Sequence, residues 1–208
     1  SERDAHQVVV WLFSGLLDGL DGLQDLVSEG HTPTMVPFMR HMRLLVDLNR
    51  ESSTVIRHLC FARQGEDGGG EIHRAACRTF LAIQVGHQNG LERAELLALG
   101  LASVLDVVTQ GTEPDRIVPA LAPYTSLSDL APQVMMTLRD FEMARRGEHA
   151  GPKGQLLLAL DVIVNTVHGE EIATLDEVFA ALGAVSALEP EVLQAIDAWL
   201  GELPIGAV

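Results

Sequence analysis

The sequence has few aromatic residues, few cysteines and no long apolar run. Phe, Trp and Tyr make up 4% of its 208 residues, and few segments show the aromatic and β-branched alternation that is typical of strands. Its two cysteines, Cys60 and Cys77, lie in apolar helical contexts without CxxC spacing, which favours buried thiols in a reducing compartment over disulfides. No apolar run approaches the roughly 18 residues of a membrane span, and the opening residues show no secretory signal. We therefore expect a cytoplasmic protein without membrane insertion.

Positive charge is also scarce. Lys and Arg number 14 against 29 Asp and Glu, so that the formal net charge is −15. So acidic a surface repels polyphosphate backbones and anionic membranes, and we expect no nucleic-acid binding. Solubility alone is the simpler explanation of the charge.

Helical periodicity dominates the sequence, of which 47% is hydrophobic. From about 3 to 28, apolar residues recur at three- and four-residue steps, and Gly30 is a suitable end. Prolines at 114, 119, 123 and 132 predict an interrupted region of short turns. We expect an all-α fold, a bundle of eight to ten helices. After the helix at about 3–28, further helices are expected near 32–48, 52–61, Glu71–Asn89, Leu91–Val108, Ala131–Arg146, Lys153–His168, Leu175–Leu182 and Pro190–Leu200.

The glycine-rich stretch Gly65–Gly70 is the clearest break in the chain. We interpret it as a flexible boundary between an N-terminal helical segment, 1–68, and a second helical domain, 69–208. The N-terminal helices carry Trp11, Phe38 and Met42, which we expect to be exposed and available for an interface or a homodimer contact. The helices expected at Glu71–Asn89, Leu91–Val108 and Lys153–His168 should pack together at the centre, because the last two are apolar almost all round.

Four stretches after Gly70 follow a recognisable order. A helix that begins with His73 is followed by Leu-Ala-Leu-Gly-Leu-Ala, an apolar pair and Asp106; later come Leu156–Asn165, Leu-Glu-Pro-Glu from 188 and Leu-Pro-Ile-Gly from 203. In this order they resemble the core of HD-GYP domains, the bacterial hydrolases of cyclic dinucleotides, over about Gly70 to Val208. The resemblance implies an HD-domain-like helical bundle, here with additional N-terminal helices, and a centre that holds two or more metal ions on His and Asp side chains.

Most of the implied metal ligands are absent. The resemblance places His73 at the family's first His, Asp106 at the Asp of the HD pair and Asp161 at the last Asp, but Leu105 replaces the paired His. The segment Leu138–Lys153 also lacks the family's His-His pair and Gly-Tyr-Pro loop. Three ligands do not build a centre of two metal ions. We therefore expect no cofactor, no stoichiometric transition metal and no catalysis.

The remaining ligands are interpreted as a vestigial site. His73, Asp106 and Asp161 are expected within about 12 Å of one another as a polar cluster around Leu105. A simpler interpretation stays open for each of them. His73 is then a polar residue at a helix N-terminus, and the two aspartates belong to an inherited polar cluster kept for packing, in which Asp106 contacts His73 or a basic residue.

This pattern leaves three functions to consider. One is a catalytically inactive HD-GYP-like regulatory domain in protein–protein interaction or signal relay. The alternative is a sensor that binds a cyclic dinucleotide without hydrolysing it, through Arg139, Arg145, Arg146 and Lys153, since arginine suits phosphate. Pairing with Asp140, Glu142 and Glu148 along the same helix is the favoured explanation of those cations. An active metal-dependent phosphodiesterase, the third possibility, is disfavoured by the missing ligands.

Overall fold

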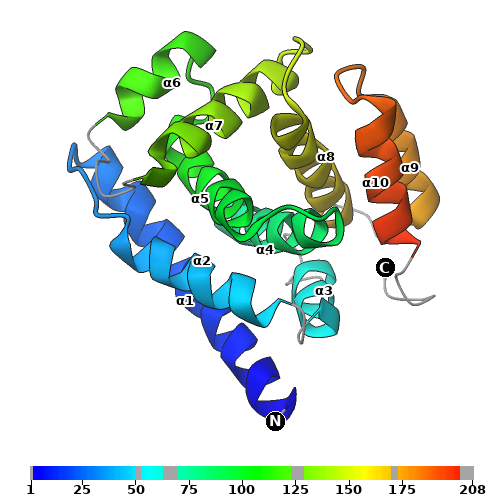
Figure 1. Cartoon of the computed structure of the whole chain (residues 1–208), viewed down its shortest axis with the longest axis horizontal. Coiled ribbons are helices and arrows are strands. Elements are labelled where there is room, and N and C mark those ends of the chain that lie inside the picture. Colours follow the sequence, from blue (N-terminus) through cyan, green and yellow to red (C-terminus); the bar gives the residue numbers. More distant parts are fainter. Residues whose placement is uncertain (1, 50–52, 63–69, 123–128, 170–172, 202–208) are drawn as a thin grey trace.

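The computed structural model describes residues 2–49, 53–62, 70–122, 129–169 and 173–201, and over these the chain forms ten helices and no strand (Figure 1). The all-α fold predicted from the sequence is confirmed. The helices are α1 (Glu2–Ser28), α2 (Val36–Leu48), α3 (Ser53–Phe61), α4 (Glu71–Gln88), α5 (Arg93–Thr109), α6 (Pro114–Leu121), α7 (Ala131–Arg145), α8 (Pro152–Val167), α9 (Leu175–Gly183) and α10 (Pro190–Leu200).

Four helices form a ring at the centre of the molecule. α4 packs against α5 on one side and α8 on the other, and α7 packs against both α5 and α8. The sequence predicted α4, α5 and α8 at the centre, and the structure adds α7. α4 and α5 are buried along most of their length, as their apolar sequence requires. α5 begins with a capping box, in which the backbone N–H of Glu92 donates to the side chain of Glu95.

The N-terminal helices share the hydrophobic core of the ring. α1 packs on α4 and α5, α2 on α5, and α3 on α4. The expectation that Phe38 and Met42 are exposed was wrong, because both are buried in this core. Glycines opposite them leave room for these two side chains. A Cβ on Gly19 would lie 3.1 Å from the Phe38 ring, and one on Gly100 would lie 2.7 Å from Met42 Sδ. Trp11 is exposed, as expected.

The predicted boundary at Gly65–Gly70 lies, except for Gly70, outside the described residues. Among its described residues, the predicted region of short turns contains one helix, α6, and Pro132 lies in the first turn of another, α7. Proline is tolerated in the first turn of a helix, because the N–H that it lacks would have no partner there, and Pro114 and Pro132 take that place. α6 also contains Pro119 and ends soon after it.

Within the described ranges, no single helix has the length and apolar character needed to cross a membrane. Taken together, α5 and α6 reach that length and composition, with a bend of 100° between them. α5 is also buried in the core, which accounts for its apolar character.

Candidate functional site

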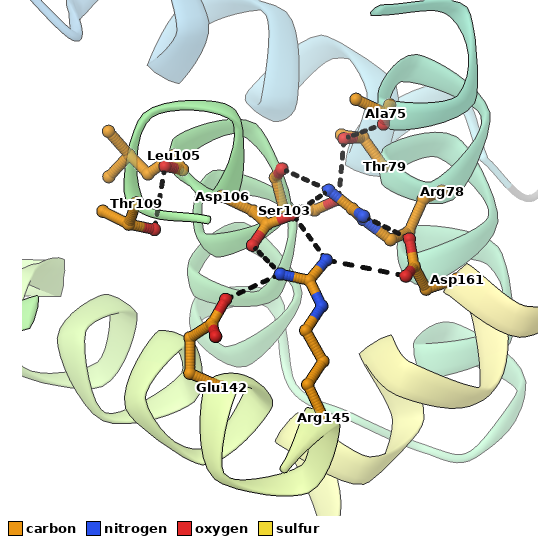
Figure 2. A network of polar contacts seen from close by, with 10 residues as sticks. All are labelled: Ala75, Arg78, Thr79, Ser103, Leu105, Asp106, Thr109, Glu142, Arg145 and Asp161. Carbon is orange, nitrogen blue, oxygen red and sulfur yellow. Dashed lines mark hydrogen bonds and ion pairs between the residues drawn. The ribbon is translucent and has the colours of Figure 1, made fainter. Parts of the chain in front are cut away.

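The two aspartates of the expected vestigial site meet inside the ring of helices. Asp106 on α5 and Asp161 on α8 are joined by Arg78 of α4, whose Nη2 donates to Asp106 Oδ2 at 2.6 Å and whose Nη1 donates to Asp161 Oδ1 at 2.5 Å (Figure 2). The side chains of Arg78 and Asp106 are 5% and 2% exposed. A guanidinium group therefore lies between two carboxylates from different helices.

A second arginine completes this network from the remaining helix of the ring. Arg145 on α7 donates to both oxygens of Asp106, at 2.6 and 2.9 Å, and to Glu142 at 2.7 Å. It also lies 3.5 Å from Asp161. Burial would lower the pKa of Arg145, but hydrogen bonding and attraction by Asp106, with Asp161 and Glu142, raise it above its ordinary value. Both guanidinium groups face the ring of Phe141, that of Arg145 at 3.8 Å.

Two further hydrogen bonds join Arg78 to Ser103. Its Nε donates to Ser103 Oγ at 3.2 Å and its Nη2 to the Ser103 carbonyl at 3.3 Å, while Thr79 donates to Ser103 Oγ at 2.9 Å. The network of Arg78, Arg145, Asp106, Asp161 and Glu142 thus pairs two cations with three carboxylates inside the protein. We call these five residues the arginine–carboxylate network. Each of the four central helices contributes at least one of them (Figure 2).

A polar pocket of about 270 Å³ adjoins the network. Its lining includes Glu71, Arg74, Arg78, Asp106, Asp161 and Asn165. Asp161 is the most exposed member of the network, with 21% of its side chain accessible, so that it forms part of the rim. The pocket is a place where a small polar molecule can reach the network from solvent.

Leu105 does not lie at the centre of the polar cluster. It is fully buried, and its carbonyl accepts a hydrogen bond from Thr109 at 3.2 Å. Figure 2 shows its side chain directed away from Arg78 and Asp161. The aspartates are organised around arginines instead.

His73 belongs to a different cluster. Its ring is buried, lies edge-on to His168 with the centroids 4.9 Å apart, and has Nδ1 3.7 Å from Cys77 Sγ. Among the contacts of the described residues, none joins His73 to Asp106 or Asp161. The structure therefore divides the three expected site residues between two polar clusters.

The two cysteines near His73 differ in acidity. Burial raises the pKa of Cys60, and the hydrogen bond to Cys77 raises it further. Burial alone would raise the pKa of Cys77 too, but hydrogen bonds with Cys60, His168 and His73 outweigh it and hold that pKa well below the ordinary value of a thiol. Burial would lower the pKa of His168, but its hydrogen bonds with Cys77 and Cys60 raise it.

The four cations expected to bind phosphate do not share one partner. Arg145 belongs to the arginine–carboxylate network, Arg146 pairs with Glu113 at 2.6 Å, and Lys153 pairs with Glu95 at 2.8 Å. Arg139 is exposed on α7. Pairing along the same helix is present for Arg145 with Glu142, whereas the partners of Arg146 and Lys153 come from elsewhere in the chain.

Sequence reasoning missed Arg78, Cys77 and His168. Arg78 had one signal, because it is a cation inside the apolar run Ala75–Ile83 and needs a buried anion. His73 and Cys77 had another, since residues four apart lie on the same side of a helix. His168 is the C-cap of α8 and is buried.

No family model, no curated protein and no solved structure matches this chain. The resemblance to HD-GYP domains therefore remains an interpretation of the sequence.

Proposed function

We propose that this chain is a non-catalytic regulatory domain, similar to HD-GYP domains, that acts in the cytoplasm through protein contacts. The observation that carries the proposal is the position of Arg78 and Arg145 between Asp106 and Asp161. A hydrolytic metal centre needs the lone pairs of its carboxylates to bind and orient the ions. Here those lone pairs accept hydrogen bonds from guanidinium groups, and a guanidinium group has no lone pair with which to bind a metal ion.

The burial of the network supports this interpretation. A metal ion at Asp106 would have to displace Arg78 or Arg145, which the ring of helices encloses. Removing a partner from a buried ion pair leaves an uncompensated charge and costs about 3–5 kcal/mol. The arginines therefore supply the positive charge that the resemblance assigns to metal ions, and they fasten the four helices together.

A protein contact is supported by the outer surface of the N-terminal helices. Trp11 is 61% exposed and stacks on His41, and Val10, Val36 and Leu44 are exposed apolar side chains of α1 and α2. A large aromatic side chain on an acidic surface favours an interface, of which a homodimer is the simplest form. The nucleotide-sensor alternative has less support, because three of its four cations are paired with carboxylates.

Two assays test the proposal. Purified protein incubated with cyclic di-GMP and Mn²⁺ or Fe²⁺ should release no product, and Leu105→His should not restore turnover, since the guanidinium groups remain. Turnover that Asp161→Asn abolishes would refute the non-catalytic interpretation. Sedimentation should show self-association that Trp11→Lys removes. Met136→Lys, at an apolar residue of α7 that is also exposed, is the control and should not change it. A monomer at all concentrations would exclude the homodimer contact.

A further inference from the structure

Three helices bring four buried sulfur and imidazole groups together outside the arginine–carboxylate network. His73 and Cys77 lie one turn apart on α4, His168 caps the end of α8, and Cys60 is near the end of α3. All four side chains are buried, with His73 the most exposed at 6%. Phe13 packs edge-on against His73, so that apolar side chains border the cluster.

The spacing of the donor atoms suits a single small cation. Cys77 Sγ lies 3.7 Å from His73 Nδ1, and one donor atom from each of His73, Cys77 and His168 falls within 4.8 Å of the others. Zinc bonds of about 2.0–2.3 Å in a tetrahedron place ligand atoms roughly 3.5 Å apart. Small side-chain rotations would close the difference.

His168 supplies an independent indication of a ligand. Its Nε2 lies 2.7 Å from the carbonyl oxygen of Cys60. A carbonyl only accepts hydrogen bonds, so Nε2 carries the hydrogen, and Nδ1 of the neutral ring has a free lone pair. Nδ1 is buried and has no hydrogen-bond partner among the described residues. Imidazole ligands of metals commonly bond a carbonyl through one nitrogen and the metal through the other.

Cys60 lies beside this group and can complete it. Its thiol is 3.7 Å from the Cys77 carbonyl oxygen and interacts with the Cys77 sulfur. Both cysteines are free thiols. Two thiolates and two neutral imidazoles around Zn²⁺ give a site of zero net charge, which suits an apolar interior. The two thiol protons leave to solvent when the metal binds.

We propose that His73, Cys77 and His168 bind one zinc ion, with Cys60 as the fourth ligand. Four protein ligands leave no open position, so the site is structural and fastens α3 to α4 and α8. This revises the sequence-based expectation that the chain binds no transition metal. The inference goes beyond the proposed function and does not use Asp106 or Asp161.

Zinc content measured by elemental analysis tests this site. Wild-type protein incubated with zinc sulfate and desalted should retain about one zinc per chain, and chelation should lower its Tm. Cys77→Ala and His168→Gln should lose the zinc, and His87→Ala, at an exposed histidine of the same helix α4, should keep it. In cobalt-substituted protein, Cys60→Ala should weaken the thiolate charge-transfer band by about half, because one of two thiolates is removed.

The cobalt spectrum of wild-type protein guards against misfolded variants, because it reports thiolate ligation without any substitution. Absence of both zinc and the thiolate band in wild-type protein would overturn the inference and leave the proposed function intact. If Asp161→Asn lost the zinc and Cys77→Ala retained it, the metal would be bound at the aspartates. That result would overturn both proposals.

Discussion

Arg145 of α7 holds the carboxylate of Asp106 on α5 through two hydrogen bonds, one to each oxygen. This bidentate geometry is the strongest form of an arginine–carboxylate pair. Replacing Arg145 by Met removes both bonds and the bond to Glu142. Asp106 then keeps only Arg78, and the buried Glu142 loses its guanidinium partner. We expect the free energy of unfolding, measured in urea, to fall by about 3 kcal/mol.

Arg146 is the matched control for this substitution. It is the next residue along the chain and also forms an ion pair, with Glu113, but that pair is more exposed. Arg146→Met should cost less than about 1 kcal/mol. Equal losses for the two variants would show that the buried network contributes no more than a surface pair.

Close packing between α2, α4 and α5 depends on the absence of a side chain at Gly100. A Cβ there would lie 2.7 Å from Met42 Sδ and 2.8 Å from Ile83 Cδ1. We expect Gly100→Ala to destabilise the protein by about 1–3 kcal/mol through overpacking, despite the higher helix propensity of alanine. Differential scanning calorimetry would measure the shift in Tm.

Gly22 of α1 provides the opposite case. It is also within a helix, but nothing lies within 4 Å of a Cβ placed on it. Gly22→Ala should therefore stabilise the protein, by about 0.5–1 kcal/mol. A loss at Gly22 similar to that at Gly100 would argue against packing as the cause.

Glu95 links pH to the contact between α5 and α8. The hydrogen bond from Lys153, and then the backbone N–H of Glu92, hold the pKa of Glu95 below its ordinary value. A carboxylate with a lowered folded pKa stabilises the fold above its unfolded pKa, and the contribution is lost as pH falls through the folded pKa. Glu95→Gln, which keeps the cap, should lower Tm at about pH 7 and match wild type once the pH has fallen below the lowered pKa of Glu95.

Thermal denaturation across this pH range, with Glu148→Gln as an exposed control, measures the effect. The difference in Tm between wild type and Glu95→Gln should narrow as the pH falls, whereas the control should follow wild type throughout. A difference that is constant with pH would mean that the loss comes from packing and not from ionisation.

The central helices could be predicted because long apolar stretches at helical spacing leave few alternatives. That Asp106 and Asp161 meet followed from the resemblance, and each needed a buried partner. The partner itself could not be predicted, since periodicity assigns a residue to a face and does not identify what lies opposite. His73 shows the same limit. Arg78 is five positions further along α4, a rotation of about 140° around the helix, so the two side chains leave it on different sides.

The arginine–carboxylate network also determines how the molecule comes apart. A different helix contributes each of the residues Arg78, Asp106, Arg145 and Asp161. If any one of α4, α5, α7 or α8 moves away, a charged side chain is therefore left inside the protein without its counterion. Partial opening of the ring is therefore costly at every helix, and we expect native-state amide exchange within it to proceed by one shared opening. α9 and α10 contribute no residue to the network, so we expect each of them to open at a lower free energy than the ring.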